Sequence, residues 1–518
     1  MPWVSAIILL PLLGALSLFA APEGNAARAR AHALVASLGT LVLTAIMVGL
    51  FDRGSGDLQF VDHQDWSGTA AMVWDVGVDG ISLWLVLLTA GLFFLAIVAA
   101  AVRTPERPRA FFGLLLLAEV GLLGLFAAGD LILFYVFWEA MLIPFALLIW
   151  MWGGRDRGPA TMSFVIYTMV GSLLMLVAIV STALIAQGPG DALTFNIQAL
   201  TDHRWTGTES TLLFCGFALA FVIKLPLFPF HGWMPRAYAA APLLVTGLLA
   251  AVMSKAGAYG LMRIGVPMFP EGADRLAPYI SWLAVAGIVY GSLVAWRATS
   301  MRMLVAYSSL AHLGFIVLGI MAFNVTAGQG AVLQMVNHGI VTAAAFAIVG
   351  IVARAKRGDE EMDHIEGLAN GAPWLAGIFL VVAMAALAIP GSNAFVGEFF
   401  ILTGVFQEEP LLAVLACIGV VYAAVYMLHL YQSSMNGPKR GMASKAELGW
   451  RDALLLTPLV AAMVFIALWP ASIVGSTQPS VTNSITAAAA ERDATSATGA
   501  AGLTATAPVR AQAEVQAP

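Results

Sequence analysis

The chain has 518 residues, of which 60% are hydrophobic and only 11% are charged, and its mean hydropathy is +0.87. Soluble domains carry about 25% charged residues, so this composition excludes a soluble globular protein and predicts a fold solvated by lipid. The net charge of −5 is small and gives no indication of a nucleic-acid partner. Cys215 and Cys417 lie within apolar runs, so we expect small core residues, with no disulfide framework and no metal cluster.

The apolar runs of the sequence predict an all-α polytopic membrane protein. A spanning helix needs about 20 mostly apolar residues, and this criterion gives about fourteen transmembrane helices, numbered spans 1 to 14. They start near Val4, Ala31, Val78, Ala110, Leu131, Thr161, Thr211, Pro242, Tyr279, Met303, Gln329, Pro373, Leu411 and Asp452. The first apolar stretch has no basic region ahead of it, so we expect a retained helix and not a cleaved signal.

The basic residues predict the orientation. Most of the 25 Lys and Arg residues fall in alternate loops, and two lysines remain inside the membrane. Cytoplasmic loops carry the excess of basic residues, so this alternation favours fourteen spans in a bacterial-type inner membrane with both termini outside. Beyond about residue 475 the composition changes to Ala, Thr and Ser. We therefore expect a transmembrane domain over 1–475 and a disordered tail over 476–518.

Ionisable residues inside the predicted spans are the candidate functional residues, because a Lys or Asp at a helix centre costs roughly 2.5 to 3.5 kcal/mol on insertion. Glu139, in LFYVFWEAMLIPF of span 5, has no local partner, which favours a proton site paired with a lysine over a neutral structural acid. Lys255 of span 8 is too central for its ammonium to reach the membrane surface. His312 and His338 lie on consecutive spans, and a pair of imidazoles favours a proton relay over simple packing.

Three further residues are candidates for an additional proton path. Glu119 lies in span 4, where it also fits a contact with a neighbouring subunit. His231 follows the lysine of span 7, and His429 lies towards the inside end of span 13. We expect these residues to be secondary to the central ones.

Proline interrupts span 7. Lys224 precedes Pro226 and Pro229 in FVIKLPLFPFHGW, and each proline removes a backbone donor and clashes with the preceding turn. A break at membrane depth is tolerated only against protein or a watery cavity. Lys224 is therefore expected to be a proton carrier and not merely the cap of a broken segment.

A second interruption lies five spans further on. Pro390 and Gly391 break span 12, and Glu398 lies about 10 Å beyond the break if the chain is helical there. The same offset relates span 5 to span 10 and span 8 to span 13, and an odd offset gives the two units opposite orientations. We therefore expect two inverted five-helix repeats, spans 4–8 (about 110–265) and spans 9–13 (about 279–436), with spans 7 and 12 broken, a pattern typical of transporters with a site at the midplane.

Over roughly spans 4 to 13 the chain resembles the antiporter-like subunits of respiratory complex I, the proton-translocating NADH-quinone oxidoreductase. The motifs that carry this resemblance are FYVFWEAMLIP, KLPLFPFHGWMPRAYAAAP running to KAGAYG, AYSSLAHLGF, QMVNHG and IPGSNAFVGEF. The resemblance assigns proton-translocating roles to Glu139, Lys224, Lys255, His312, His338 and Glu398. The glutamate on span 12, and an end after span 14 without a long lateral helix, are similar to the subunit M group, the counterpart of mitochondrial NADH dehydrogenase subunit 4.

The resemblance also implies how the chain works. It implies that this chain carries no cofactor, that FMN, iron–sulfur clusters and quinone belong to other subunits, and that quinone reduction there drives proton transfer here. The sequence contains no Rossmann fingerprint, cysteine run or haem motif. The expected partners are the lipid bilayer and the other membrane-arm subunits, including neighbouring antiporter-like subunits. Protons are expected to enter from inside along Lys255, His312, His338 and Lys224, and to leave outward under the control of Glu139 and Glu398.

Other functions and one departure from the family pattern stay open. The chain also fits a subunit of a multi-chain sodium/proton antiporter, a membrane subunit of an energy-converting hydrogenase, or a structural scaffold. The family loop after span 7 usually reads PDAHxxAP, whereas this chain reads from Pro235 through Arg236 and Tyr238 to Pro242. A carboxylate and an imidazole are thus replaced, so the resemblance does not carry a proton-entry role to this loop.

Overall fold

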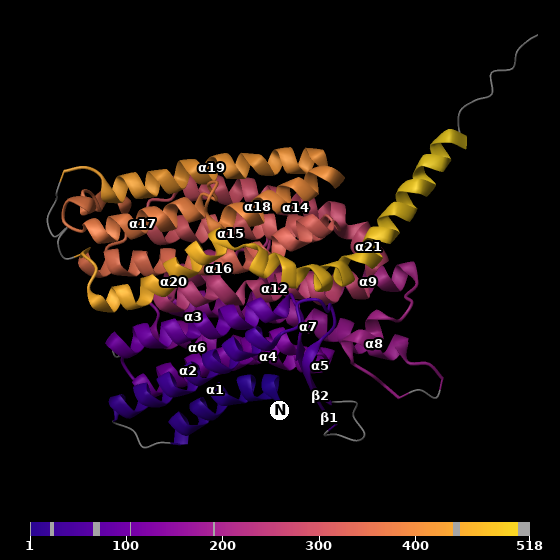
Figure 1. Cartoon of the computed structure of the whole chain (residues 1–518), viewed down its shortest axis with the longest axis horizontal. Helices are drawn as coiled ribbons and strands as arrows, with labels where there is room; N and C mark the ends of the chain where they lie inside the picture. Colours follow the sequence, from indigo (N-terminus) through magenta and orange to yellow (C-terminus); the bar gives the residue numbers. More distant parts are fainter. Residues whose placement is uncertain are drawn as a thin grey trace, which may run out of the picture.

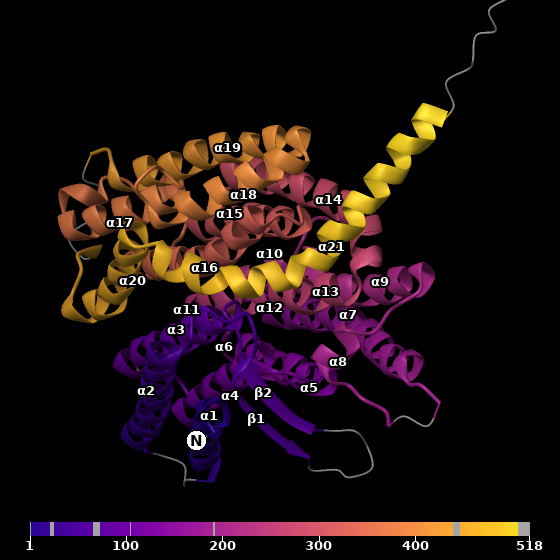
Figure 2. The same ribbon diagram turned by 45° about the vertical axis from the view of Figure 1, so that its right-hand side comes forward.

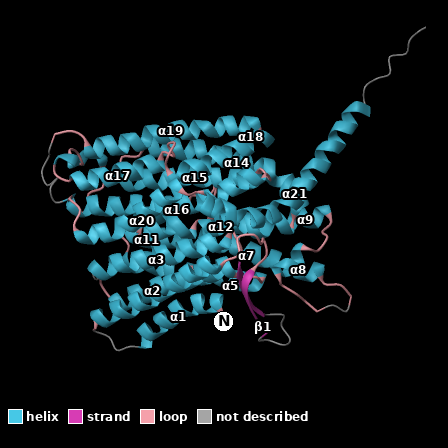
Figure 3. Cartoon of the chain, in the orientation of Figure 1, coloured by secondary structure: helices cyan, strands magenta, loops and turns pink. Residues whose placement is uncertain are grey.

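In the computed structural model, the structure describes residues 2–20, 25–65, 73–103, 105–189, 192–438 and 446–505, with side chains as far as residue 494. Figure 1 shows long helices lying side by side, with the N-terminal helices at one edge, α19 (Pro410–Met435) at the opposite edge, and the C-terminal helices crossing the middle of the bundle. Figure 3 shows that helices account for nearly all of the fold.

The helices follow the predicted spans in order. Spans 1 to 7 are α1 (Trp3–Ala20), α2 (Ala26–Leu50), α3 (Ser82–Arg103), α4 (Pro108–Ala127), α5 with α6 (Leu131–Ala140 and Leu142–Trp152), α7 (Arg157–Ala186) and α9 with α10 (Gly207–Lys224 and Trp233–Ala240). Spans 8 to 14 are α11 to α13 (Leu243–Met268), α14 (Pro270–Arg297), α15 (Met301–Met321), α16 (Val325–Ala355), α17 with α18 (Pro373–Ala386 and Asn393–Glu408), α19 (Pro410–Met435) and α20 (Trp450–Leu468).

The structure confirms the predicted fold class. Within the described residues, thirteen helical segments are long and apolar enough to cross a membrane. The 14-residue α17 and the 16-residue α18 are each shorter than the roughly 20 residues that a span needs, but they follow one another across a break and complete the fourteen (Figure 1). Four short helices, α8 (Ile197–Thr201), η3 (Met362–His364), η4 (Leu368–Asn370) and α10, lie in connections or beside breaks.

The most buried spans form the centre of the bundle. In spans 4, 8 and 10, 89% of the apolar window is buried inside the protein, and in span 11 the share is 83%. Spans 1 and 2 are 33% buried and span 14 is 28% buried, so they lie at the periphery. The central spans are the ones that carry Glu119, Lys255, His312 and His338, which places these four residues far from lipid.

Two strands depart from the all-α prediction. β1 (Gln59–Asp65) and β2 (Val73–Val78) form an antiparallel hairpin between α2 and α3. The hairpin contacts the start of α1, where the Ser5 amide donates to Asp62 at 3.0 Å and Trp74 Nε1 donates to the Ser5 hydroxyl at 2.8 Å. Alternation of polar and apolar residues over so few positions is a weak signal in a sequence dominated by apolar runs. We call the end of the helix bundle that carries this hairpin the hairpin side. The opposite end of the bundle, where α3 ends at Arg103, is called the arginine side.

The predicted disordered tail is wrong for residues 476–505, because α21 is a helix over Ala471–Ala505. Figure 2 shows it running along the bundle and then projecting beyond it. Its Ser476 accepts from Trp84 Nε1 at 2.8 Å, and its Ser480 accepts from the Gly80 amide at 2.9 Å. Small residues let helices approach closely, so the composition that suggested disorder here allows tight packing. Residues 506–518 of the predicted tail lie outside the described residues.

Candidate functional site

Lys255 lies at the centre of span 8, between two π-helical segments. η1 (Leu249–Met253) precedes it and η2 (Leu261–Gly265) follows the short α12 (Lys255–Gly260). Its side chain is completely buried, and Nζ lies 2.7 Å from the Ala250 carbonyl oxygen. π-Helical turns occur frequently at functional sites, and here the Ala250 carbonyl oxygen accepts both from Lys255 and from the Ser254 hydroxyl, the latter at 2.8 Å. The local backbone thus provides a binding place for a buried ammonium.

Lys255 also contacts a histidine on the next helix. Its Nζ lies 2.6 Å from Nδ1 of His338 on α16. With Lys255 charged, its ammonium donates and Nδ1 of His338 is the acceptor, which leaves the ring hydrogen on Nε2. The ring of His338 is 5.6 Å from the ring of His312 on α15, measured between centroids. The three residues therefore form a continuous buried row across three spans.

Glu398 on α18 ends this row. His312 Nδ1 lies 2.8 Å from Glu398 Oε1, and Gln334 Nε2 donates to the same oxygen at 3.0 Å. The carboxylate is 4% exposed and holds two hydrogen bonds, so its burial cost is offset by its neighbours. The row Lys255–His338–His312–Glu398 joins the two predicted repeats, and we call it the central row.

The break in span 12 adjoins the central row. α17 ends at Ala386 and α18 begins at Asn393, so the structure confirms the break predicted at Pro390 and Gly391. Gly391 has a φ of 93°, a conformation that a residue with a Cβ rarely adopts. The Asn393 carbonyl oxygen, in the first turn of α18, accepts from Asn337 Nδ2 at 2.7 Å, and Asn393 Nδ2 donates to Asn337 Oδ1 at 3.0 Å, so two hydrogen bonds join α18 to α16 beside the break.

A small cavity lies between the two histidines and this break. Its volume is about 20 Å³, and its lining includes His312, Gln334, His338 and Ala386. A cavity needs roughly 10 to 15 Å³ to hold one water, and it needs polar partners for that water. The space beside the two imidazoles therefore fits a single bridging water.

Span 7 is broken as predicted, but the environment of its lysine, Lys224, differs from that of Lys255 in span 8. α9 ends at Lys224 and α10 begins at Trp233, with Pro226 and Pro229 between them. Trp233 Nε1 donates to the Ile223 carbonyl oxygen at 2.8 Å, which satisfies one of the freed groups. Lys224 Nζ is buried without a hydrogen-bond partner and lies 4.9 Å from the centre of the Trp138 ring.

Glu139 faces Lys224 without touching it. The carboxylate attracts the ammonium electrostatically, yet no oxygen of Glu139 lies within 4 Å of Lys224 Nζ among the described atoms. Glu139 is half-buried, and its Oε1 also lacks a hydrogen-bond partner. The structure thus brings the predicted pair, Glu139 and Lys224, near each other without a salt bridge between them. Lys224 also makes no hydrogen bond to a residue of the central row.

The secondary candidates lie outside the central row. Glu119 on α4 is completely buried, and neither of its oxygens has a hydrogen-bond partner. His231, in the break of span 7, packs against Phe228 and Tyr290 with ring centroids at 5.6 and 5.1 Å. His429 lies on the exposed face of α19. The proposed additional path through these three residues stays a prediction.

Arg236 and Tyr238, the two loop residues that differ from the family pattern, lie in different environments. Arg236 is exposed on α10, on the arginine side. Tyr238 is completely buried and packs edge-on against Trp233 and Phe346, with ring centroids 6.2 Å away in both cases. The tyrosine therefore fills space where the family pattern has an ionisable ring.

Sequence reasoning missed a second polar group beside span 8. Arg263 Nε lies 2.7 Å from Asp79 Oδ2, and Asp79 caps the start of α3 by accepting from the amides of Ile81 and Ser82. Tyr259, one turn after Lys255, donates to the Phe126 carbonyl oxygen at 3.0 Å and lies close to this ion pair. Arg263 lies near the end of an apolar run in the sequence, which gives no indication of a buried partner. An Asp-x-x-Ser sequence before an apolar run is a helix-start signal that indicates the cap but not the arginine.

Comparison with known proteins identifies the family. Residues 128–424 match the family described as NADH:quinone oxidoreductase/Mrp antiporter, TM. NADH-quinone oxidoreductase subunit M of Rhodobacter capsulatus is 36% identical, over 92% of this chain and 95% of that protein. A chain of respiratory complex I from Thermus thermophilus is 31% identical with a TM-score of 0.85, over 94% of this chain and 99% of that chain.

A structure of the Mrp complex from a Dietzia species contains a chain that is 20% identical, with a TM-score of 0.81 over 94% of this chain and 98% of that chain. At that identity the likeness shows the fold alone. The curated relatives and the complex I chain, by contrast, match in sequence over nearly their full length. The chain therefore belongs to the subunit M family of NADH-quinone oxidoreductases.

Proposed function

We propose that this chain is the proton-translocating membrane subunit M of an NADH-quinone oxidoreductase, and that its protons move along the central row. The observation that carries the proposal is the unbroken series of buried contacts from Lys255 through His338 and His312 to Glu398, with distances of 2.6 and 2.8 Å at its two ends. Imidazole takes and gives protons near neutral pH, so each inner member of the row can pass a proton on.

The ends of the row suit uptake and release. The Lys255 ammonium donates to a neutral imidazole, so a proton transferred to His338 leaves a neutral amine that can be recharged. At the other end, a proton that reaches His312 is attracted by the Glu398 carboxylate. The cavity of about 20 Å³ between the rings gives room for the one water that joins His338 to His312.

Glu139 and Lys224 are the switch of the proposed mechanism, because the ion pair between them can form and break. When they pair, each lowers the burial cost of the other. When they separate, desolvation favours loss of the proton from Lys224. The structure has the two groups close but unpaired, at the break of span 7. We propose that redox energy from other subunits drives the change between the paired and the separated state.

The redox chemistry is proposed to lie on those other subunits. Iron–sulfur clusters are held by four cysteine or histidine ligands, and this chain has two cysteines, one on α9 and one on α19. FMN, iron–sulfur clusters and quinone are accordingly assigned to partner chains. The exposed apolar faces of α1, α2, α7 and α20 are available to lipid and to neighbouring membrane-arm subunits.

The chain is proposed to lie in a bacterial plasma membrane with both described ends on the outer side. The start of α1 contacts the hairpin, and Arg492 of α21 donates to the Ala322 carbonyl oxygen at the hairpin-side end of α15. The two ends therefore share one side. The loops on the other side hold most of the arginines, which is typical of a cytoplasmic face.

The test is Lys255→Ala in the intact complex, with Lys356→Ala as the matched control. Lys356 lies in the loop after α16, outside the spans. NADH-driven proton uptake in inverted membrane vesicles should be lost in Lys255→Ala and retained in Lys356→Ala, with equal NADH:ferricyanide activity in both. Full uptake by Lys255→Ala would support a scaffold instead. Sodium/proton exchange without NADH, lost in Lys255→Ala, would indicate the antiporter function.

A further inference from the structure

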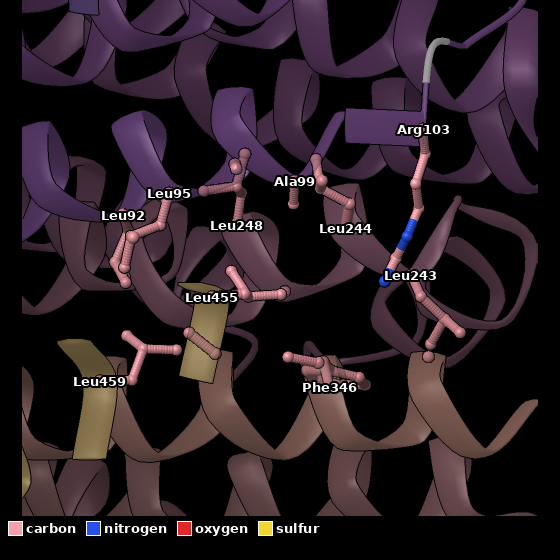
Figure 4. A pocket seen from close by; sticks show the side chains of 15 residues that line it. Leu92, Leu95, Ala99, Arg103, Leu243, Leu244, Leu248, Phe346, Leu455 and Leu459 are labelled. Carbon is pink, nitrogen blue, oxygen red and sulfur yellow. The ribbon is translucent and has the colours of Figure 1, made fainter. Parts of the chain in front are cut away.

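A narrow apolar groove runs between α3, α11 (Leu243–Leu248), α16 and α20. Figure 4 shows its side chains in a row that begins at Leu92 and ends at Arg103. The cavity here measures about 80 Å³, and every lining residue other than Arg103 is apolar. Leu92 and Arg103 are eleven residues apart on one helix, about 16 Å, which is half the thickness of a bilayer core. This part of the groove therefore spans one leaflet.

A second cavity extends the groove towards the hairpin side. It measures about 360 Å³ and shares Leu92, Leu95 and Leu459 with the first. Trp84 lies at its far end, so the two cavities together follow nearly the whole length of α3. The groove is continuous, apolar and open along the side of the bundle, which is where the tails of surrounding lipids are found.

Positive charge is concentrated at the arginine-side end. Arg103 and Arg354 both donate to Asp452 Oδ1, at 2.7 and 2.8 Å, and their side chains are 41% and 44% exposed. Arg451, next to Asp452 in sequence, adds electrostatic repulsion on Arg103. Two guanidinium groups thus share one carboxylate, with the charge of a third nearby, and Arg103 and Arg354 each retain donors for a further anion.

We propose that this groove binds an anionic phospholipid of the arginine-side leaflet. One acyl chain lies in the groove along α3, and the phosphate lies between Arg103 and Arg354. Basic pockets between transmembrane helices on the cytoplasmic side are suited to anionic headgroups, because the charge attraction adds to the burial of the tail.

The site has a structural role beside the central row. α16 forms the floor of the groove through Val336 and Ile340, which flank His338. An acyl chain there covers the side of α16 that faces away from Lys255 and keeps water and ions out of the groove. The proposal stands apart from the route of the protons, because it rests on the groove and the arginines alone.

The first experiment uses Gly91, which lies on the groove wall and has no atom within 4 Å of the position of an added Cβ. Gly91→Leu therefore fills the groove without a clash in the backbone. The control is Gly49→Leu on α2, where an added Cβ also meets nothing and which does not line either of the two cavities. Both variants exchange a helical glycine for leucine.

The complex is reconstituted with phosphatidylglycerol or phosphatidylcholine that carries a diazirine on one acyl chain, illuminated, and digested. We expect phosphatidylglycerol to label peptides of α3 and α20, with labelling reduced at least fivefold in Gly91→Leu and unchanged in Gly49→Leu. Equal labelling of the parent and Gly91→Leu would overturn the groove as the site.

The second experiment tests the headgroup. Arg103→Gln with Arg354→Gln should lower labelling by phosphatidylglycerol to the level of phosphatidylcholine, while addition of inorganic phosphate should leave the parent's labelling unchanged. Assembly is checked by native gel electrophoresis, and labelling is expressed per assembled complex. If the parent already labels equally with both lipids, the arginines do not select an anion and the proposal is wrong.

Discussion

The two broken spans use the same backbone device and hold their charges in opposite ways. In span 12, Glu398 has two hydrogen bonds, at 2.8 Å from His312 and 3.0 Å from Gln334. In span 7, Lys224 has no hydrogen-bond partner, and its Nζ lies 4.9 Å from the centre of the Trp138 ring. A charged group with hydrogen-bond partners is stabilised in one protonation state. A charged group without such partners changes its protonation state at a small cost in free energy. This difference favours the first predicted repeat as the part of the chain that switches in the proposed mechanism.

The largest effect is expected from breaking the switch. Glu139→Gln removes the charge that attracts Lys224 and should reduce NADH-driven proton uptake to less than about a tenth, since a positioned acid or base contributes 10²-fold or more. Glu139→Asp keeps the charge and should retain much of the uptake. Lys224→Ala should be as damaging as Glu139→Gln, and the double variant little worse, because both changes break one coupled unit.

The measurement is proton uptake in inverted vesicles, normalised to assembled complex by NADH:ferricyanide activity. Glu139→Gln vesicles that pump like the parent would show that the carboxylate is structural and that the switch does not exist.

Glu398, which has hydrogen-bond partners, should contribute more to the stability of the subunit than Lys224, which has none. Glu398→Ala leaves the His312 ring and the Gln334 amide without a buried partner, which costs about 1 to 3 kcal/mol for each group. Lys224→Ala removes a buried ammonium that has no hydrogen bond, so it should cost less or stabilise. Thermal unfolding of the purified complex, followed by loss of this subunit from the assembly, compares the two. A lower unfolding temperature for Lys224→Ala than for Glu398→Ala would reverse the comparison.

The breaks themselves should have an intermediate effect. Pro226→Ala and Pro390→Ala each restore a backbone donor and favour a straighter helix. Pro229 still interrupts span 7 in the first variant, so we expect Pro390→Ala to reduce proton uptake more. Both complexes should assemble. Proton uptake equal to the parent in both variants would show that the breaks are not needed for pumping.

The smallest effect is expected at the start of the helix that carries Glu139. Asp130 caps α5 by accepting from the amides of Ile132 and Leu133, and burial raises its pKa from 3.8 to about 6. Because the folded state binds this proton more tightly, Asp130 favours folding below about pH 4 and this contribution is lost as the pH rises to 6. Asp130→Asn keeps a capping side chain and removes the titration.

The unfolding temperature of Asp130→Asn should therefore fall less than that of the parent between pH 4 and pH 6, by about 2 °C or less in an assembly of this size. Identical pH profiles for the two proteins would show that Asp130 does not titrate in this window.

The sequence was sufficient to predict the spans, both breaks and the residues of the central row. Proline cannot continue a helix, and a lysine or histidine in an apolar run stands out, so Lys224, Lys255 and His338 could be found without coordinates. What could not be predicted was the pairing. The expected path placed Lys224 beside the histidines, whereas the structure joins Lys255 to His338 and His312 to Glu398.

The sequence also did not predict the uncharged hydrogen-bond partners of the site, because these residues are distinguished by their position in the fold and not by a charge. Gln334 and Asn337 are ordinary polar residues in sequence, and only packing of α16 against α18 shows that they satisfy Glu398 and the Asn393 carbonyl. α21 was missed for a related reason. Its Ser and Ala residues suggest a solvated chain when burial is judged by bulk, but they pack because they are small.

The hydrogen bonds between α21 and the start of α3 have a consequence for synthesis of the chain. Trp84 and Ser476 are 392 residues apart, and Gly80 and Ser480 are 400 apart. At 5 to 20 residues per second, the ribosome needs about 20 to 80 s to add the second partner after the first. During that time the indole N–H of Trp84 and the amide of Gly80 lack the acceptors that they have in the folded chain, so α3 reaches its final packing only when translation is nearly complete.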